Sequence, residues 1–299
     1  MNRKMLFFVN PKAGQLELRT HLMEVLTVFT EAGYDVTVHT TLGRCDLTDY
    51  LSQEAEHYDL VVCAGGDGTL NEAVSGLMRL ERRPPLGYIP GGTVNDVAAT
   101  LGLSRNPVEA ARAIVAGTPY AIDIGSLGDD RWFTYVAGFG AFTDVSYQTP
   151  QQDKRIFGRL AYFINGVKSL GEVRPIQVRM EAGEQVVEDE VLLGLVCSTT
   201  SVGGFRARQP LDIKLNDGLF EVLLAKNIKT MADLNALGAL LLRGEFDPAF
   251  FHTLQVSRVS FTFPSEVKWT ADGEFGGARR QVDIVNHHQA VEILVPKTA

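Results

Sequence analysis

A glycine-rich turn offers the first chemistry in this sequence. Gly65 and Gly66 follow the apolar run Leu60–Ala64, and Asp67 and a helical pattern follow them. Glycine lets the backbone turn sharply, and the N–H groups at a helix N-terminus bind phosphate. Asp67 adds a carboxylate where magnesium or a ribose would lie. Two glycines alone fit a structural turn equally well, but the full string GGDGT followed by LNEAV is more specific for a nucleotide site.

A second candidate is the string DGE at Asp272 to Glu274. It comes just after the strand-like run VKWT, with only Ala271 between them, so the end of a strand can direct the Asp272 carboxylate into a cleft. Taken alone, the string is better explained as a β-turn that uses Asp and Gly for their backbone tolerance. Its chemical meaning therefore depends on the elements around it.

The elements that position the first turn alternate between strand and helix. This rhythm predicts a parallel sheet with helices on both faces, and ligands of such sheets bind beyond the carboxyl ends of the strands. We therefore expect the loops NPKAG, TTLG, GGDGT and PGGTVND to converge on one site. The predicted strands are Met5–Val9, Val36–His39, Leu60–Ala64 and Leu86–Ile89, and the predicted helices lie around Leu16–Ala32, Leu47–Ala55 and Leu70–Leu80.

The second half has a different pattern. From about Trp132 onward, short alternating segments predict antiparallel strands arranged as a sandwich. One helix interrupts them, with Thr230 as N-cap, Asp233 at the capping-box position and a stop at Gly244. The predicted strands are Ile176–Met180, Leu192–Cys197, Phe220–Leu224, Val256–Phe263, Val282–Val285 and Val291–Val295.

Composition excludes several classes of protein. The formal net charge of −8 argues against general binding to nucleic acid or to an anionic membrane, so any membrane contact must be local. The three cysteines are far apart and form no CxxC pair, which predicts neither a disulfide framework nor a thiolate zinc site. No stretch approaches about 18 consecutive apolar residues. We expect a soluble protein of the reducing cytoplasm.

Five segments in a fixed order resemble the diacylglycerol kinase catalytic-domain superfamily, and in particular its soluble bacterial lipid kinases. Relatives there act on phosphatidylglycerol, and sphingosine and ceramide kinases are distantly similar. The resemblance spans nearly the whole chain. The segments are NPKAG at Asn10 to Gly14, GGDGT with Asn71 and Glu72, PGGTVNDVAATLGL at Pro90 to Leu103, LNDGLFEV at Leu215 to Val222, and DGE at Asp272 to Glu274.

The resemblance implies two domains. Residues 1–125 would form an α/β nucleotide-binding domain like those of NAD kinases and phosphofructokinases, and residues 126–289 an all-β, sandwich-like domain carrying the base and the lipid site. The last strand, near residues 290–299, would return to the first domain. The residue pattern alone predicts the same two fold classes, but it does not predict that the last strand returns to the first domain.

The resemblance also implies roles for individual residues. Asp272 matches the general base that takes the proton from a lipid hydroxyl, supported by Glu274. A structural Mg²⁺ would be held by the Asp217 side chain and the backbone carbonyls of Lys214 and Leu219, although a simple hairpin turn also fits NDG. The nucleotide positions are Asn10, Pro11, Lys12, Ala13, Gly14, Thr41 (or its neighbour Thr40), Gly65, Gly66, Asp67, Gly68, Thr69, Leu70, Asn71, Thr93, Asn95 and Asp96.

The implied reaction is transfer of the γ-phosphate of ATP, with Mg²⁺, to a lipid hydroxyl, most simply that of diacylglycerol. Phosphatidylglycerol or another lipid alcohol is the first alternative. An NAD kinase shares GGDGT, although PGGTVND and DGE favour the lipid kinases. A nucleotide sensor without catalysis is a further alternative, against which the retained Asp67, Asp96 and Asp272 argue.

Partners and departures complete the expectations. The segment Asp153–Leu170 mixes basic and apolar residues, as in a helix at a membrane interface, although a helix packed on the sandwich also fits. We expect transient contact with the inner face of the membrane. Dimerisation is common among the soluble bacterial relatives, and the sequence leaves the oligomeric state open between a monomer and a homodimer. Ala99, Phe205 and Asp212 depart from the family pattern, which affects substrate identity more than reaction type.

Overall fold

The chain forms two compact units. The computed structural model describes residues 3–11, 16–93, 95–141, 174–198, 201–202, 205–206, 215–243 and 245–297. Unit 1 comprises Met1–Ile122 and Gln289–Ala299, and unit 2 comprises Asp123–His288. The chain passes between them twice, through β5 (Thr118–Leu127) and through β15 (Glu274–Val295). The boundary expected at residue 125 falls within β5.

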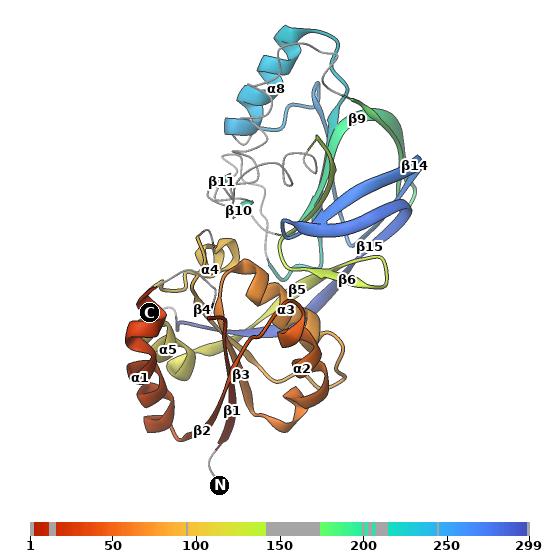
Figure 1. Ribbon diagram of the computed structural model, residues 1–299. Helices are drawn as coiled ribbons and strands as arrows, with labels where there is room; N and C mark the ends of the chain where they lie inside the picture. The colour runs from red at the N-terminus through yellow and green to blue at the C-terminus, as the bar shows by residue number, and fades with distance from the viewer. Residues whose placement is uncertain are drawn as a thin grey trace. The chain divides into compact units, whose positions relative to one another are not determined.

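Unit 1 contains a parallel sheet with helices on both faces, which confirms the predicted fold class. Strand β3 pairs in parallel with β1 and β4, and β2 pairs with the outer side of β1. Figure 1 shows α1 and α5 on one face of this sheet and α2 and α3 on the other. The elements are β1 (Arg3–Val9), α1 (Leu16–Glu31), β2 (Tyr34–Thr40), α2 (Asp46–Glu54), a 3₁₀ turn at Ala55–His57, β3 (Leu60–Gly65), α3 (Asp67–Leu77), β4 (Leu86–Pro90), α4 (Asp96–Leu101) and α5 (Pro107–Ala116).

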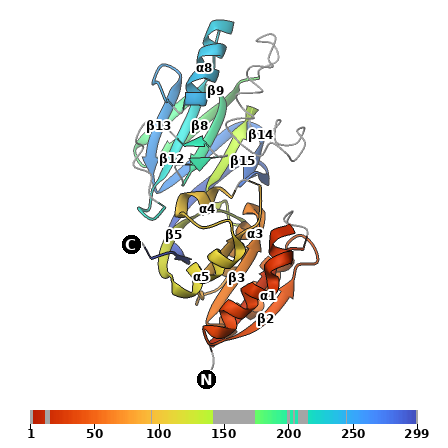
Figure 2. The ribbon, with the colours of Figure 1, turned by 90° about the vertical axis from the view of Figure 1, so that its left-hand side faces the viewer.

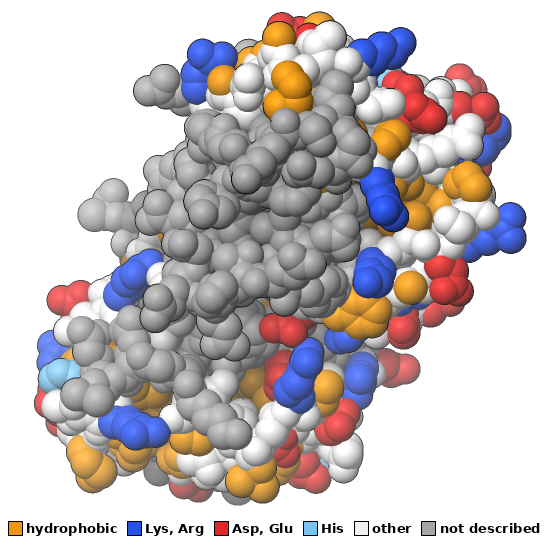
Figure 3. Space-filling model, turned by 45° about the horizontal axis from the view of Figure 1, so that its top comes forward, with side chains coloured by type: hydrophobic (Ala, Val, Ile, Leu, Met, Phe, Trp, Pro, Cys, Tyr) orange, Lys and Arg blue, Asp and Glu red, His pale blue; other side chains and the backbone are white. Residues whose placement is uncertain are grey.

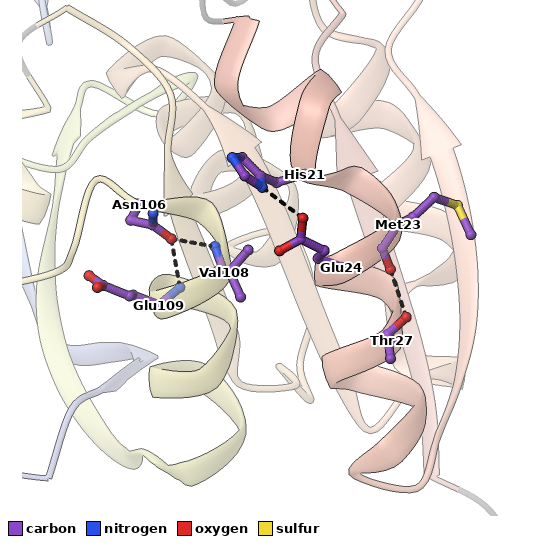
Figure 4. Close-up of polar contacts among 7 residues, drawn as sticks. All are labelled: His21, Met23, Glu24, Thr27, Asn106, Val108 and Glu109. Carbon is purple, nitrogen blue, oxygen red and sulfur yellow. Dashed lines mark hydrogen bonds and ion pairs between the residues drawn. The ribbon is translucent and has the colours of Figure 1, made fainter.

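The local sequence explains why these elements form. Strand β3 is buried along its whole length, as expected for a central parallel strand made of Val, Leu and small residues. At the start of α5, the Asn106 Oδ1 atom accepts hydrogen bonds from the backbone N–H groups of Val108 and Glu109, each at 3.0 Å (Figure 4). Pro107 then occupies the first turn, where its missing N–H costs nothing. The N-terminus of α5 is thus capped, and the helix packs against α1.

The last part of β15 completes the sheet of unit 1. Ile293 of β15 pairs in parallel with Leu86 of β4, and both side chains are fully buried. Strand β15 therefore adds to the sheet beside β4, the side opposite to β2. A segment distant in sequence thus belongs to the core of unit 1.

Unit 2 is built of antiparallel strands, as predicted, and Figure 2 shows β8, β9, β12 and β13 in it. The long strands β9 and β14 are each paired with both β7 and β8, so these four strands form a closed ring of pairs. The elements are β6 (Arg131–Phe133), β7 (Val136–Gly140), β8 (Ile176–Ala182), β9 (Gln185–Cys197), β10 (Ser201–Val202), β11 (Phe205–Arg206), β12 (Phe220–Lys226), α8 (Met231–Arg243), β13 (Phe251–Val256) and β14 (Arg258–Ala271).

Aromatic side chains fill the core of unit 2. The Trp269 ring lies 4.7 Å from the Phe139 ring and 5.4 Å from the Phe261 ring, centroid to centroid, and all three are fully buried. At the predicted helix start, Thr230 Oγ1 accepts a hydrogen bond from the Asp233 N–H at 3.1 Å and donates one to Asp233 Oδ2 at 2.7 Å. The predicted N-cap of α8 is confirmed, and the Asp233 side chain binds the hydroxyl of this cap.

Three predicted strands have different bounds in the structure. Val256–Phe263 is not one strand, because β13 ends at Val256 and β14 begins at Arg258. The alternation of apolar residues changes phase at this break, because two polar residues, Ser257 and Arg258, separate Val256 from Val259. Conversely, Val282–Val285 and Val291–Val295 belong to the single strand β15, and Gln289 adopts a positive φ of 50° between them. Helix α5 and strand β5 were not predicted.

The helices in the described ranges are all too short or too polar to cross a membrane. The segment Asp153–Leu170, expected to meet a membrane interface, lies outside the described residues.

Candidate functional site

The loops at the carboxyl ends of β1, β2 and β3 are joined by hydrogen bonds. Asn10 follows β1; its backbone N–H donates to the Ala64 carbonyl at 3.1 Å, and its Nδ2 donates to Thr69 Oγ1 at 3.2 Å. Thr41 follows β2, and its N–H donates to the Val9 carbonyl at 3.0 Å. Three of the loops that the sequence predicted to converge therefore meet in unit 1.

Two glycine turns, the first at Gly65 and Gly66 after β3 and the second at Gly91 and Gly92 after β4, pack backbone against backbone. The Gly91 N–H donates to the Gly65 carbonyl at 2.6 Å. A Cβ atom added at Gly92 would lie 2.6 Å from the Gly66 Cα and 2.7 Å from Asn95 Oδ1, distances that real Cβ atoms do not tolerate. Glycine is required here by close approach of the two turns.

Asn95 holds the second turn in place. It has a left-handed backbone (φ 57°), and its side chain accepts from the Gly92 N–H at 2.9 Å and donates to the Gly92 carbonyl at 2.8 Å. Its own N–H donates to Asp67 Oδ2 at 2.9 Å. The Asp67 carboxylate thus links the first turn to the second, and Asn95 and Asp96 are both only 2% exposed.

Tyr88 lies beneath both turns. Its hydroxyl is 3.1 Å from the Gly65 carbonyl and 3.2 Å from Asn95 Oδ1. Burial raises the pKa of Tyr88 well above its usual value, and the nearby Asp67 carboxylate adds to this shift to a lesser extent. The hydroxyl therefore stays protonated and acts as a hydrogen-bond donor.

Gly68 differs from the other glycines of this site. It is the second residue of α3, and no atom of the described residues lies within 4 Å of a Cβ added there. Its φ is not in the left-handed range either, so neither packing nor backbone conformation requires glycine at this position. Gly66 caps α3 without a side-chain hydrogen bond, and the space at this helix N-terminus is open. These residues fit a phosphate group, which such N–H groups bind.

In unit 2, the Asp272 carboxylate accepts four hydrogen bonds from described residues. Its Oδ2 accepts from the Thr134 N–H at 2.7 Å and from Thr134 Oγ1 at 2.8 Å, and its Oδ1 accepts from the N–H groups of Tyr135 and Val136 at 3.0 Å each. Asp272 lies in the turn between β14 and β15, with φ 49°. Burial raises the pKa of Asp272, and the hydrogen bonds oppose that shift. The carboxylate is therefore fixed in one orientation.

Two acidic side chains, those of Asp217 and Asp123, bind the backbone of the loop that contains the string NDG. Asp217 Oδ1 accepts from the Leu219 N–H at 3.0 Å, which turns the loop. Asp123 on β5 is 1% exposed, and its Oδ2 accepts from the Gly218 N–H at 2.6 Å. His288 Nδ1 lies 3.7 Å from the Asp123 carboxylate. The carboxylate and carbonyl oxygens of this loop fit a hard cation such as Mg²⁺.

Glu221, two residues beyond Leu219, is the buried acid nearest in sequence to this loop. Burial, and to a lesser extent the Asp217 carboxylate, raise the pKa of Glu221 to about 7. Neither Glu221 nor Asp123 was predicted as a site residue. The sequence does carry a signal for Glu221, since it is the one acidic residue in the apolar run Leu219–Ala225.

Several predicted site residues are less informative. Pro11, Thr93 and Glu274 are exposed, Leu70 is buried in the core of unit 1, and Asn71 Oδ1 lies 3.5 Å from Ser75 Oγ. Phe205 lies in β11. Lys12, Ala13, Gly14, Lys214 and Asp212 lie outside the described residues. Roles for all of these stay predictions.

Comparison with known proteins identifies the class. The profile of the diacylglycerol kinase catalytic domain matches residues 4–127, and that of the YegS C-terminal NAD kinase beta sandwich-like domain matches residues 136–294. A nucleotide-type α/β domain followed by a sandwich-like domain is thus the architecture of this chain.

Relatives match over the full length. A diacylglycerol kinase of Bacillus subtilis (strain 168) is 36% identical over 96% of this chain and 95% of its own, and one of Staphylococcus saprophyticus is 33% identical over 99% and 96%. A crystal structure of a diacylglycerol kinase from Bacillus anthracis str. Sterne has a TM-score of 0.78 at 25% identity and covers 99% of this chain and 98% of its own. The chain belongs to the diacylglycerol kinase family of lipid kinases.

Proposed function

We propose that this protein transfers the γ-phosphate of ATP to the hydroxyl of a lipid, with diacylglycerol as the first candidate and phosphatidic acid as its product. The observation that carries the proposal is the open space at Gly68, above two glycine turns that Asn95 and Asp67 hold together. The names of the full-length relatives support diacylglycerol as acceptor. Phosphatidylglycerol or another lipid alcohol is the alternative acceptor.

The nucleotide phosphates would bind at the N-terminus of α3. Gly66, Gly68 and Thr69 supply this end of the helix, and Asn10 is hydrogen-bonded to Thr69. Thr41 and Thr93 lie in the loops after β2 and β4, and Asp96 is the first residue of α4. The mainly backbone character of this site suits phosphoryl transfer, in which the protein mostly positions groups and neutralises charge.

Asp272 would collect the proton of the lipid hydroxyl. As the bond between that oxygen and the γ-phosphorus forms, the bond from the γ-phosphorus to the β-γ bridging oxygen breaks, and ADP leaves. Four donors among the described residues already bind the Asp272 carboxylate, so the lipid hydroxyl would take the place of one of them. The Thr134 hydroxyl is the donor that can rotate away, because the other three are backbone groups. Glu274, exposed beside the turn, would support this exchange.

Mg²⁺ would be held in unit 2 by the Asp217 side chain and the Leu219 carbonyl, with Lys214 as the third expected ligand. Bound there, the cation would fix the loop, and Mg²⁺ carried with ATP would neutralise phosphate charge. Asp123 would hold the same loop from the side through the Gly218 N–H.

The lipid acceptor requires contact with a membrane surface. We propose transient, peripheral contact with the inner face of the cytoplasmic membrane. Because the net charge of −8 opposes binding to an anionic surface, this contact must be local. On the face seen in Figure 3, basic and acidic side chains of the described residues are interspersed. Light scattering decides between a monomer and the homodimer that is common among the bacterial relatives.

The test is transfer of label from γ-labelled ATP with Mg²⁺ to a mixed-micelle panel. The panel contains diacylglycerol, phosphatidylglycerol, ceramide, sphingosine and undecaprenol, with NAD as an added acceptor. We expect labelled diacylglycerol, and a loss of at least about a hundredfold in Asp272→Asn, the lower scale for removal of a general base. Label on NAD would indicate an NAD kinase, and ATP binding without transfer would indicate a sensor.

Asp272→Asn needs a check of its folding. The Asn NH₂ group would face N–H donors where Asp272 now accepts, so the variant also loses a structural hydrogen bond. Its ATP affinity and its melting temperature are therefore measured alongside. Near-normal turnover in a folded variant would show that the base is misassigned, and Glu274→Gln would then be the next variant.

A further inference from the structure

Glu221 is an acidic residue enclosed by the β-sheet of unit 2. It is the second residue of β12 and is 7% exposed, between Phe220 and Val222, which are fully buried or nearly so. Across the sheet it pairs with Cys197 of β9 on one side and with Gln255 of β13 on the other. Acidic residues are almost never this buried unless they have a partner.

Only half of the Glu221 carboxylate has a partner. Its Oε1 accepts a hydrogen bond from Gln255 Nε2 at 3.1 Å. Its Oε2 is buried, and among the residues that the structure describes no donor reaches it. A buried carboxylate oxygen without a partner is costly, and such atoms in native proteins call for an explanation, often an ion or a water.

The groups around Glu221 do not supply a positive charge. Asp217, four residues before Glu221 in the chain, adds a second carboxylate rather than a positive charge. Asp123 adds a further buried carboxylate to the same loop through the Gly218 N–H. The Cys197 thiol is buried in an apolar setting, which with the Glu221 carboxylate raises its pKa, so it stays neutral. Within the described ranges, no Lys or Arg forms an ion pair with Glu221.

A divalent cation accounts for all of these features together. It would neutralise the like charges of Asp217 and Glu221 and would supply the missing partner of the buried oxygen. Carboxylates and backbone carbonyls are the ligands of Mg²⁺, which usually keeps several water ligands. An oxygen that lies beyond direct reach of the ion can therefore still bind one of its waters.

We propose that Glu221 Oε2 is part of the divalent-cation site of unit 2, where it binds the cation or one of its water ligands. The inference rests on the proposed function, which assigns Asp217 and Leu219 to the same cation. Glu221 thereby joins β12 to the loop before it, and it acts as a positioning residue with no contact to the reacting atoms.

The competing explanation is that Glu221 is a neutral, protonated carboxyl group with a purely structural role. Glu221→Gln separates the two, because Gln has nearly the same shape and no charge. In EDTA the variant is expected to be at least as stable as the wild type in either case, since it removes a buried acid. The response to the cation differs: a structural carboxyl group predicts an unchanged response, and a cation ligand predicts its loss.

The experiment measures cation binding in the full-length protein. Isothermal titration with Mg²⁺, electron paramagnetic resonance with Mn²⁺ and melting curves with and without EDTA are compared for the wild type, Glu221→Gln, Glu221→Asp and Asp217→Asn. We expect Mg²⁺ to raise the melting temperature of the wild type by mass action. The affinity should fall at least tenfold in Glu221→Gln and in Asp217→Asn, and less in Glu221→Asp.

Glu188→Gln is the matched control, because Glu188 is an exposed acid of unit 2 that pairs with Arg179. Its cation affinity should equal that of the wild type. Wild-type affinity in Glu221→Gln together with weak binding in Asp217→Asn would overturn the inference and leave the proposed function intact. A wild type that transfers phosphate but shows no cation binding apart from that of ATP would overturn the site and the inference together. The label-transfer assay tests the proposed function separately.

Discussion

Asn95 and Asp272 share an unusual backbone conformation. Both have positive φ, 57° and 49°, although neither is glycine. Such angles cost free energy and persist where the surroundings fix them. Here the side chain of Asn95 is bonded to Gly92, and that of Asp272 to three consecutive residues of the neighbouring segment. At both positions the hydrogen bonds of a polar side chain fix the local geometry: those of Asn95 hold a turn beside the proposed phosphate site, and those of Asp272 orient the proposed base.

The glycines of the two turns give a prediction at the scale of single residues. Gly92→Ala should destabilise the protein strongly, because its Cβ would meet the Gly66 backbone at 2.6 Å. Gly68→Ala should keep or slightly raise stability, by up to about 1 kcal/mol, because Ala favours a helix more than Gly. It should nevertheless weaken ATP binding at least tenfold, since the added methyl group would enter the proposed phosphate space.

Urea unfolding and titration with a fluorescent ATP analogue measure the two effects separately. Gly33→Ala is the control for a glycine away from the loops; it has a left-handed backbone (φ 82°), so it should lose stability and keep its ATP affinity. Unchanged ATP binding in a stable Gly68→Ala would remove the assignment of the phosphate site.

The cap of α5 gives a prediction at the scale of an element. Asn106 accepts two hydrogen bonds at the start of this helix, and Ala110 and Ile114 of α5 belong to the core of unit 1 (Figure 4). Asn106→Ala should lower the free energy of unfolding by about 1 kcal/mol, whereas Asn106→Asp should retain stability. Urea denaturation checks both. Equal losses in the two variants would show that the cap contributes little.

Local patterns predicted the elements better than their partners. Strands β1, β3 and β4 were found because each is a short apolar run before a glycine or polar loop. The cap of α8 was found because Thr230 and Asp233 have the right spacing. The pairing of Ile293 with Leu86 was not visible in the residue pattern, because it joins segments far apart in sequence. It was expected only from the family resemblance.

The candidate site shows the same limit. GGDGT and PGGTVND were recognised by their letters, and the structure joins them through the Gly91 and Asn95 N–H groups. The contact of Asp272 with residues 134–136 was not predicted, since nothing near Thr134 signals a carboxylate partner. Asp123 was missed for the same reason. A sequence motif therefore predicts which loops form a site. It does not predict the hydrogen-bond partners from distant parts of the chain, because these depend on the topology of the fold.

At the scale of the molecule, the proposed membrane contact gives a prediction. Lys154, Arg155 and Arg159 lie in the segment expected at the interface, and basic residues near an anionic surface are attracted to it. A triple alanine variant should bind vesicles containing anionic lipid several-fold more weakly, as measured by sedimentation. Activity toward a short-chain diacylglycerol dissolved as monomer should stay unchanged. Equal sedimentation of variant and wild type would remove this segment from the contact.

The double passage of the chain between the units bears on the order in which the protein is made. Strands β1 to β4 leave the ribosome early, but the partner of Leu86 in β15 is synthesised only after the whole of unit 2. The core of unit 1 therefore stays incomplete while unit 2 is translated, and the side of β4 that β15 later covers is a free sheet edge during that time. The nucleotide loops emerge first, yet the domain that holds them is completed last. A chain that ends at His288 would contain all of unit 2 and would lack the segment of β15 that completes the sheet of unit 1.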